Sequence, residues 1–219
     1  MTILEAQDLS KTYETRGVET RALEDIDLVI DEGEFTALAG PSGSGKTTLL
    51  NLLGALDEPS SGQVRLDGEN LADLGPAKLS ELRLRKLGFV FQAYNLIPVF
   101  SAAENVEFVM ELQGIPAAER RKRATELLAQ VELEGLGDKR PLEMSGGQQQ
   151  RVAVARALAS RPRIILADEP TANLDSKTAI RLLDLMVGLN REGGWGILRQ
   201  DLLDAPLDLQ QALVQGIMV

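Results

Sequence analysis

The segment GPSGSGKTT at residues 40–48 constrains the fold of this chain more than any other stretch. The apolar run FTALAG leads into the segment, and the helically spaced TTLLNLLGAL continues from it. The segment matches the pattern G-x-x-x-x-G-K-[ST], whose fixed positions are Gly40, Gly45, Lys46 and Thr47. A strand, a glycine-rich loop and a helix in this order are the context in which the pattern binds phosphate.

The chemistry of phosphate explains the residue types in this loop. Glycines at positions 43 and 45 allow backbone conformations that aim successive N–H groups at phosphate oxygens. Lys46 reaches the β- and γ-phosphates as a point charge, and Thr47 offers a hydroxyl to Mg²⁺. The loop therefore predicts a site for a nucleoside triphosphate. The candidate binding residues are Gly40, Pro41, Ser42, Gly43, Ser44, Gly45, Lys46, Thr47 and Thr48.

Composition excludes several other kinds of site. The 219 residues include no cysteine, which excludes disulfides and thiol catalysis, and no histidine, which removes the commonest general base. The net charge of −10 argues against nucleic-acid binding, because duplex binding needs excess Lys and Arg. The N-terminus is too polar for a signal peptide, and no run approaches the ~20 apolar residues of a membrane span. We therefore expect a soluble protein that reaches a membrane only through a partner.

Apolar runs alternate with amphipathic segments along the chain. We expect two short strands within residues 1–30, further strands at 35–40, 61–70, 86–92 and 163–170, and helices at 47–56 and 176–191. Strands that alternate with helices predict an α/β fold with a mostly parallel sheet. Residues from about 93 to 160 are mostly helical in pattern and predict a subdomain inserted into that fold.

Two adjacent acids follow the apolar run RIILA. Asp168 and Glu169 therefore leave the carboxyl end of a buried strand, which is the edge where open α/β sheets bind ligands. Successive side chains of a strand point in opposite directions, so the two acids can take separate tasks. We expect Asp168 to hold Mg²⁺ through its water shell and Glu169 to orient the attacking water.

A second glycine motif, SGGQQQRVAVARAL, occupies residues 145–158. Its serine and two glycines precede an alanine-rich helical pattern. The N-terminus of a helix presents free N–H groups and the positive end of the helix dipole to an anion. Ser145, Gly146, Gly147 and Gln148 therefore predict a second anion site in a chain that already has a phosphate loop.

Together and in this order, the motifs resemble those of the nucleotide-binding subunits of ABC transporters. The resemblance runs from about residue 3 to about residue 190, with Met144 where leucine is usual. It implies one domain over residues 1–219, with a P-loop NTPase core, an N-terminal antiparallel β subdomain and the inserted helical subdomain. It also implies hydrolysis of ATP with Mg²⁺ at the cytoplasmic face of a membrane, by a peripheral subunit bound to an integral membrane permease.

The resemblance gives the second glycine motif a ligand. Two copies, or paired subunits, pack head to tail, and each SGGQ caps the γ-phosphate held by the other subunit's phosphate loop. A serine hydroxyl and glycine N–H groups suit a terminal phosphate, which exists only before hydrolysis. ATP would therefore hold the dimer together, and hydrolysis would release it.

Further positions match the family residue by residue. Tyr13 falls where an aromatic ring stacks on adenine, Gln92 where a glutamine senses Mg²⁺ and the γ-phosphate, and Asp175 in the interface loop ANLD. Residues 92–106 either pack in the core or form a groove for a short helix of the membrane partner. The motifs look most like the subgroup that serves lipoprotein release and macrolide export. Soluble family members that act on DNA or ribosomes are an alternative that the net charge of −10 disfavours.

The C-terminal part departs from the family, which expects a strand ending in Thr-His-Asp after the 176–191 helix. Gln200 and Asp201 fit the His-Asp pair best, with the strand slightly short. Glutamine can hydrogen-bond a phosphate but carries no positive charge. The atypical tail from about 193 to 219 has three explanations. The first is a frameshift, a recombination or an error in the gene model. The second is a degenerate subunit that binds ATP without hydrolysing it, and the third is a working site with Gln200 as a catalytic residue. Under the first two, we expect ATP binding to survive better than turnover and a missing edge strand to cost stability.

Overall fold

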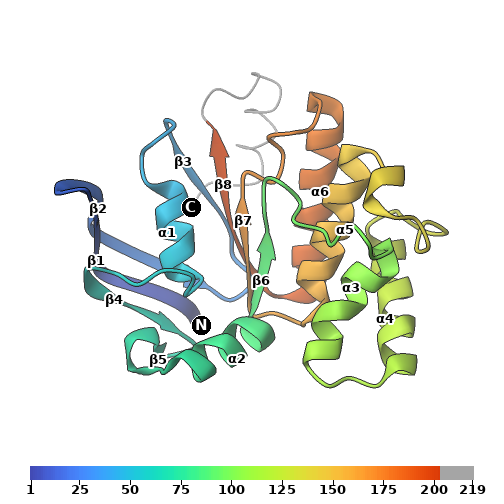
Figure 1. Ribbon diagram of the computed structural model, residues 1–219, viewed down its shortest axis with the longest axis horizontal. Helices are drawn as coiled ribbons and strands as arrows, with labels where there is room; N and C mark the ends of the chain where they lie inside the picture. Colours follow the sequence, from blue (N-terminus) through green and yellow to red (C-terminus); the bar gives the residue numbers. More distant parts are fainter. Residues whose placement is uncertain (203–219) are drawn as a thin grey trace.

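The computed structural model describes residues 1–202, which form two β-sheets flanked by helices (Figure 1). The antiparallel sheet has the order β2-β1-β4-β5, and its strands are β1 (Thr2–Thr15), β2 (Val18–Asp31), β4 (Ser61–Leu66) and β5 (Glu69–Asn70). The parallel sheet has the order β3-β8-β7-β6, and its strands are β3 (Phe35–Gly40), β6 (Leu87–Val90), β7 (Ile164–Asp168) and β8 (Gly196–Leu202).

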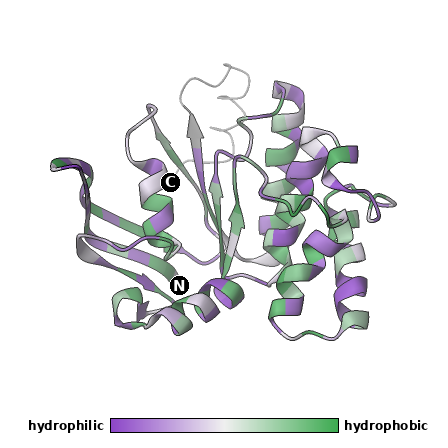
Figure 2. Ribbon diagram, in the orientation of Figure 1, coloured by the Kyte–Doolittle hydropathy of each residue, from purple (hydrophilic) through white to green (hydrophobic). Residues whose placement is uncertain are grey.

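The helices divide between the two faces of the parallel sheet. They are α1 (Lys46–Leu53), α2 (Pro76–Lys86), α3 (Ala102–Leu112), α4 (Ala117–Gln130), α5 (Gly146–Ala159) and α6 (Ser176–Gly193), with short 3₁₀ turns at Leu71–Asp73 and Pro141–Glu143. Helix α1 lies between the two sheets, and α3 to α6 gather beyond the other face (Figure 1). Along these helices hydrophilic and hydrophobic residues alternate, as expected of helices that bury one side (Figure 2).

Strand β7 shows how the parallel sheet joins two hydrophobic clusters. Ile164 and Leu166 belong to the cluster around α1 and the antiparallel sheet, whereas Ile165 and Ala167 belong to the cluster around α3 to α6. All four side chains are at most 2% exposed. A strand buried on both faces reads as a continuous apolar run, and each buried aliphatic side chain contributes about 1.5–3 kcal/mol.

The expected fold class is confirmed, with an antiparallel sheet at the N-terminus, a parallel sheet and helices between residues 93 and 160. Two local expectations were incomplete. The N-terminal strands are 14 residues each rather than short. Helix α2 was not expected, because PAKLSELRLRK is strongly polar and buries only Leu82. In residues 1–202, no helix is both long and apolar enough to cross a membrane.

A missing edge strand, which the sequence left open among the explanations of the atypical tail, is not what the structure shows. Strand β8 is present and lies inside the sheet, where Ile197 pairs with Phe35 of β3 on one side and with Ile165 of β7 on the other. Three apolar or small residues, Gly196, Ile197 and Leu198, suffice to bury the first half of the strand. The remainder of the atypical tail, residues 203–219, lies outside the described residues.

Candidate active site

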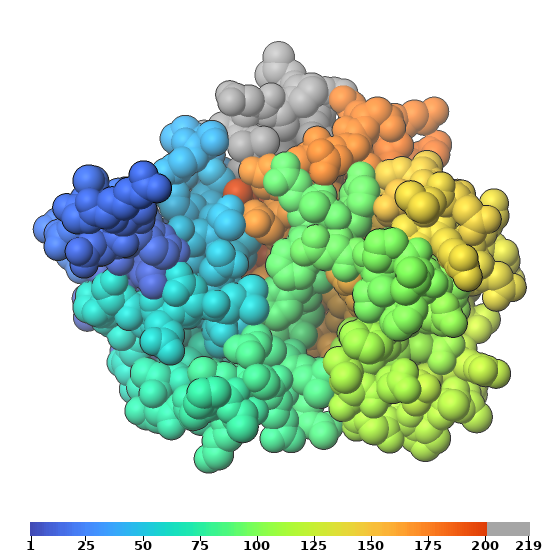
Figure 3. Space-filling view, in the orientation of Figure 1, coloured from blue at the N-terminus to red at the C-terminus, as the bar shows by residue number. Residues whose placement is uncertain are grey.

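The candidate residues follow the carboxyl ends of all four parallel strands. The phosphate loop at 40–48 follows β3, Gln200 lies near the end of β8, Asp168 ends β7, and Gln92 follows β6. Since the four strands are parallel neighbours, these positions meet at one edge of the sheet, where open α/β sheets bind ligands. In Figure 3 the red-orange end of β8 reaches the surface between the blue phosphate-loop segment and the orange segment after β7.

Glycine is required at the start of α1 for two separate reasons. Gly45 has φ +89°, a left-handed conformation that side chains rarely adopt. A Cβ built on it would also lie 2.3 Å from the carbonyl oxygen of Ala22 in β2. No side chain caps α1, so the N–H groups of its first turn are left for a ligand. Gly43, with φ +79°, turns the loop in front of this helix end.

Lys46 is folded against its own loop. The side chain is 8% exposed, and Nζ donates hydrogen bonds to the carbonyl oxygens of Gly40 at 2.7 Å and Pro41 at 2.9 Å. The Ser44 hydroxyl accepts a third hydrogen bond at 3.3 Å. These acceptors hold the positive charge of the ammonium group against the phosphate loop.

Strand parity brings the acidic residues to the phosphate loop. Leu166 and Leu198 face α1, so Asp168 and Gln200, two residues further along each strand, face it too. Thr47 Oγ1 on α1 accordingly lies 3.4 Å from Asp168 Oδ1 and 3.3 Å from Gln200 Oε1, within donating reach of either. A hydroxyl beside a carboxylate is the oxygen donor set that Mg²⁺ prefers, so the residues present fit the ion.

Gln200 joins this cluster to Glu169. Its Nε2 donates to Glu169 Oε1 at 3.2 Å, and the side chain is only 4% exposed. Glu169 has φ +46°, which is uncommon for a residue other than glycine, and strained backbone of this kind concentrates at functional sites. The structure therefore brings Thr47, Asp168, Glu169 and Gln200 into one connected group.

Burial raises the pKa of Asp168 above its ordinary value, and the neighbouring charge of Glu169 raises it further, against smaller opposing effects of Thr47 and Lys46. A carboxyl group whose pKa is raised in the folded state destabilises the fold once it ionises. Stability from this group is therefore present below the unfolded pKa of 3.8 and is lost as pH rises through the raised value.

We accordingly expect Asp168→Asn to raise the Tm of the nucleotide-free protein at pH 7 by about 2 °C. The amide removes the buried charge, and the difference from wild type should shrink as pH falls toward 3.8. Thermal unfolding across pH without Mg²⁺ measures this. A lower Tm for Asp168→Asn at pH 7 would contradict the account.

The two remaining loop motifs cap their own helices. Ser145 Oγ accepts from the Gln148 N–H at 3.3 Å, and Gln148 Oε1 accepts from the Ser145 N–H at 2.9 Å, which makes a capping box at the start of α5. Asp175 likewise caps α6, accepting from the N–H and the hydroxyl of Thr178, and this hydroxyl lowers the pKa of Asp175. Both motifs thus have a structural role in addition to any ligand.

The glycines of SGGQ permit close packing. A Cβ on Gly146 would lie 2.7 Å from the Tyr94 hydroxyl oxygen, and one on Gly147 would lie 2.7 Å from Thr178 Cγ2. The motif therefore contacts the loop after Gln92 and the first turn of α6 within the same chain. The ANLD loop joins them, because Asn173 Nδ2 donates to the Gln92 carbonyl oxygen at 2.9 Å.

This packing predicts a rescue. Gly146→Ala should destabilise the fold by about 1 kcal/mol at most, because the new methyl displaces only the Tyr94 hydroxyl at the far end of a half-buried side chain. Tyr94→Phe removes that oxygen, so the double variant should recover most of the loss. Denaturant unfolding of the single and double variants measures it, and equal losses in both would contradict the contact.

Tyr13 stands apart from this group. Its hydroxyl donates to Asp57 Oδ2 at 2.8 Å, and Lys11 Nζ lies 4.8 Å from the ring centroid. The side chain is exposed on β1, and no hydrogen bond within residues 1–202 connects it to the phosphate loop. Stacking on adenine therefore stays a prediction.

Comparison with known proteins identifies the family. The family model described as "ABC transporter" matches residues 23–172. The chain belongs to the ABC transporter family. An uncharacterised ABC transporter ATP-binding protein of Thermotoga maritima is 50% identical over 194 residues, which is 87% of this chain and 82% of that protein. The lipoprotein-releasing system ATP-binding protein LolD of Chromohalobacter salexigens is 46% identical over 187 residues, which is 85% of this chain and 79% of LolD.

Two further relatives extend the family assignment. The macrolide export ATP-binding/permease protein MacB of Brucella melitensis is 48% identical over 191 residues, but this chain spans only 30% of its length. The ABC cassette MJ0796 of Methanocaldococcus jannaschii, in a dimeric post-hydrolysis state bound to ADP and Pi, has a TM-score of 0.86 and 42% identity, over 96% of this chain and 91% of MJ0796. The prediction of an ABC-family ATPase with a P-loop fold is therefore confirmed.

Proposed function

We propose that the chain is the ATP-hydrolysing subunit of an ABC transporter, and that two copies pair around shared ATP·Mg²⁺ sites to drive an integral membrane permease from the cytoplasmic face. The observation that carries this is the hydrogen-bonded group of Thr47, Asp168, Glu169 and Gln200 beside the phosphate loop. We propose lipoprotein or drug and peptide export across the cell envelope as the transport class, and the names of MacB (macrolide export) and LolD (lipoprotein release) support it in part.

Each residue of the site has a task in phosphoryl transfer. The loop N–H groups and Lys46 hold the β- and γ-phosphates, and Thr47, Asp168 and Gln92 would hold Mg²⁺, which neutralises phosphate charge when bound. Glu169 orients and polarises the attacking water. Ser145 and the glycines after it would cap the γ-phosphate of the second copy, where their N–H and O–H donors stabilise the transferring group.

The structure supports turnover rather than ATP binding alone. Gln200 lies where the family has histidine, and it contacts both Thr47 and Glu169. The amide cannot supply the charge of a protonated histidine, but it fixes the orientation of the Glu169 carboxylate. The site therefore keeps the positioning task that hydrolysis requires.

Gln200→Ala should accordingly lower kcat about 10- to 100-fold, because the Glu169 carboxylate loses a part-buried hydrogen bond that orients it. ATP affinity should change by less than about threefold, since the phosphate-loop N–H groups and Lys46, which we assign to holding the phosphates, are untouched. Gln200→His should match or exceed the wild-type rate. Wild-type kcat in Gln200→Ala, with an unchanged Tm, would show that Gln200 has no part in catalysis.

A groove offers a place for the permease. It has a volume of about 340 Å³ and lies between α2, α3, α5 and the loop after β6. Phe89 and Phe91 line it with parallel rings whose centroids are 5.7 Å apart, and Val109 adds apolar surface. An apolar groove of this kind suits a short amphipathic helix. Of the segment 92–106, Asn95 lines the groove whereas Leu96 packs against the core.

Phosphate release by the purified chain with Mg²⁺ and ATP tests the proposed activity. The account predicts release that requires Mg²⁺ and stops in Glu169→Gln. ATP binding without release, restored in part by Gln200→His, would place the defect at that residue. ATP binding without release in both would favour a binding module instead of an ATPase.

A further inference from the structure

Arg156 is an arginine within the otherwise apolar half of α5, VAVARAL, and it has a contact that no motif predicts. Its guanidinium donates to the carbonyl oxygen of Tyr94 at 2.9 Å and to that of Asn95. Both acceptors belong to the loop after β6 that contains Gln92. A planar guanidinium can bind two neighbouring acceptors at once, which the ammonium group of lysine does not do with a fixed geometry.

The two acceptors belong to strained residues. Tyr94 has φ +61° and Asn95 has φ +49°, so two consecutive residues other than glycine adopt the left-handed conformation. Such backbone persists only where its surroundings determine it. The two hydrogen bonds from Arg156 supply that determination, because they bind the carbonyl groups of the two residues concerned.

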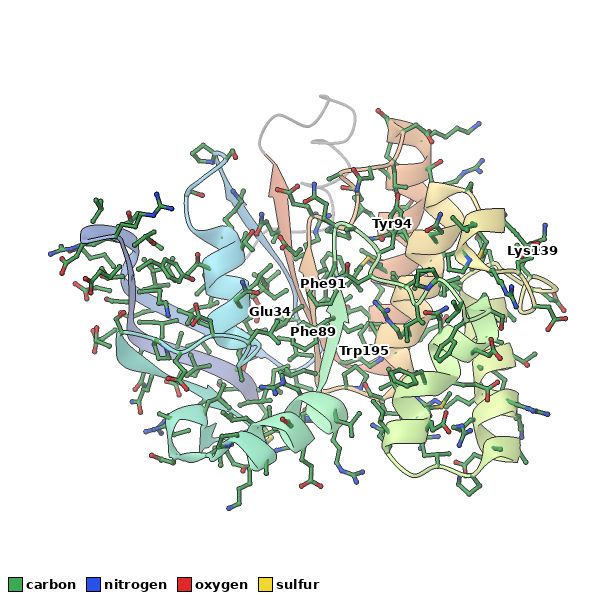
Figure 4. The ribbon with its side chains drawn as sticks, viewed as in Figure 1. Glu34, Phe89, Phe91, Tyr94, Lys139 and Trp195 are labelled. Atoms are coloured by element: carbon green, nitrogen blue, oxygen red, sulfur yellow. The ribbon has the colours of Figure 1, made fainter. Side chains whose placement is uncertain are left out.

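The strained loop is also held from the opposite end. The Gln92 carbonyl oxygen accepts from Asn173, and the Tyr94 hydroxyl faces Gly146. Figure 4 shows Tyr94 beyond the end of β6, on the side of α5 and α6, with Phe91 nearer the sheet. Gln92 therefore sits on a short segment fixed between Asn173 and Arg156.

Arg156 and Asn95 also line the 340 Å³ groove together with Phe89 and Phe91. We infer that Arg156 is a positioning residue for ATP hydrolysis, which holds the loop that carries Gln92 in place. The inference rests on the proposed function and assigns a residue that acts through Gln92.

A double-mutant cycle tests this role. Arg156→Lys keeps the charge but loses the paired hydrogen bonds, so kcat should fall about tenfold while the Kd for ATP stays within about twofold. In a Gln92→Ala background the same substitution should change kcat by less than about twofold, because its effect passes through Gln92. If the two fold-changes multiply instead, Arg156 has only a structural role and the inference is overturned.

Arg123→Lys is the matched control, since Arg123 also donates to a backbone carbonyl, but to that of Leu158 on α5 and not to one of the loop. It should keep wild-type kcat, and an equal loss there would overturn the inference. The hydrogen-exchange rate of the backbone amides of residues 92–97 tests, without any need for turnover, whether Arg156 keeps the loop in place. Faster exchange in Arg156→Lys than in Arg123→Lys supports the inference, and equal exchange in the two variants overturns it. This comparison does not depend on turnover. A wild-type chain that releases no phosphate would count against the proposed function and not against the role of Arg156.

Discussion

Replacing Glu169 with glutamine is expected to lower kcat for ATP hydrolysis about 100- to 10,000-fold, the range that a positioned general base contributes. Glutamine keeps the shape of the side chain, and its oxygen can still accept the hydrogen bond from Gln200 Nε2. Only the capacity to polarise water is lost. The Kd for ATP should therefore stay within about threefold, because the phosphate loop is untouched.

Glu126→Gln is the control for this substitution, because Glu126 is an exposed carboxylate on α4, outside the site. It should turn over at the wild-type rate. Steady-state phosphate release and fluorescent-nucleotide titration on the same samples separate rate from affinity. If Glu169→Gln retains more than about a tenth of wild-type kcat, a residue other than Glu169 positions the attacking water.

Lys46→Ala is expected to raise the Kd for ATP about 10- to 100-fold, which corresponds to the 1.5–3 kcal/mol of a hydrogen bond to a charged group. The ammonium group is held beside the loop by Gly40 and Pro41, so little ordering is needed before it meets a phosphate. Its removal also leaves two carbonyl groups without their donor. A modest loss of Tm should therefore accompany the loss of affinity.

Lys122→Ala provides the comparison, since Lys122 is an exposed lysine of α4. It removes one positive charge from the chain without touching the loop, and ATP affinity should be unchanged. Isothermal titration at a temperature well below both Tm values measures the two variants. An unchanged affinity for ATP in Lys46→Ala would contradict the assignment of residues 40–48 as the phosphate-binding loop.

Local motifs predicted the site because its chemistry is local. The phosphate loop follows the half-buried strand β3, and Asp168 and Glu169 lie at the carboxyl end of the buried strand β7, which places all of them at the ligand-binding edge of the sheet. The apolar run that precedes each of them is visible in the sequence. Their placement in the structure therefore followed from short segments, without knowledge of the remainder of the chain.

Contacts between distant segments could not be predicted in this way. Sequence reasoning placed Gln200 at the histidine position of a slightly short strand, but it could not predict that Gln200 contacts Glu169 and Thr47 from a strand inserted between β3 and β7. Arg156 was missed for a similar reason. Its hydrogen bonds join residues 61 and 62 positions apart, and the only signal in the sequence was a charge within an apolar helix.

The mass of Glu169→Gln in solution, with and without ATP, tests the shared-site account most directly. We predict the mass of a monomer without nucleotide and the mass of a dimer with saturating ATP·Mg²⁺. The dimer persists because this variant does not hydrolyse the ATP that holds it together. Ser145→Ala in the same background should weaken pairing. Ser101→Ala, which removes the matching capping serine of α3, should not. A chain that binds ATP yet stays monomeric, or that pairs equally well in both serine variants, would contradict the account.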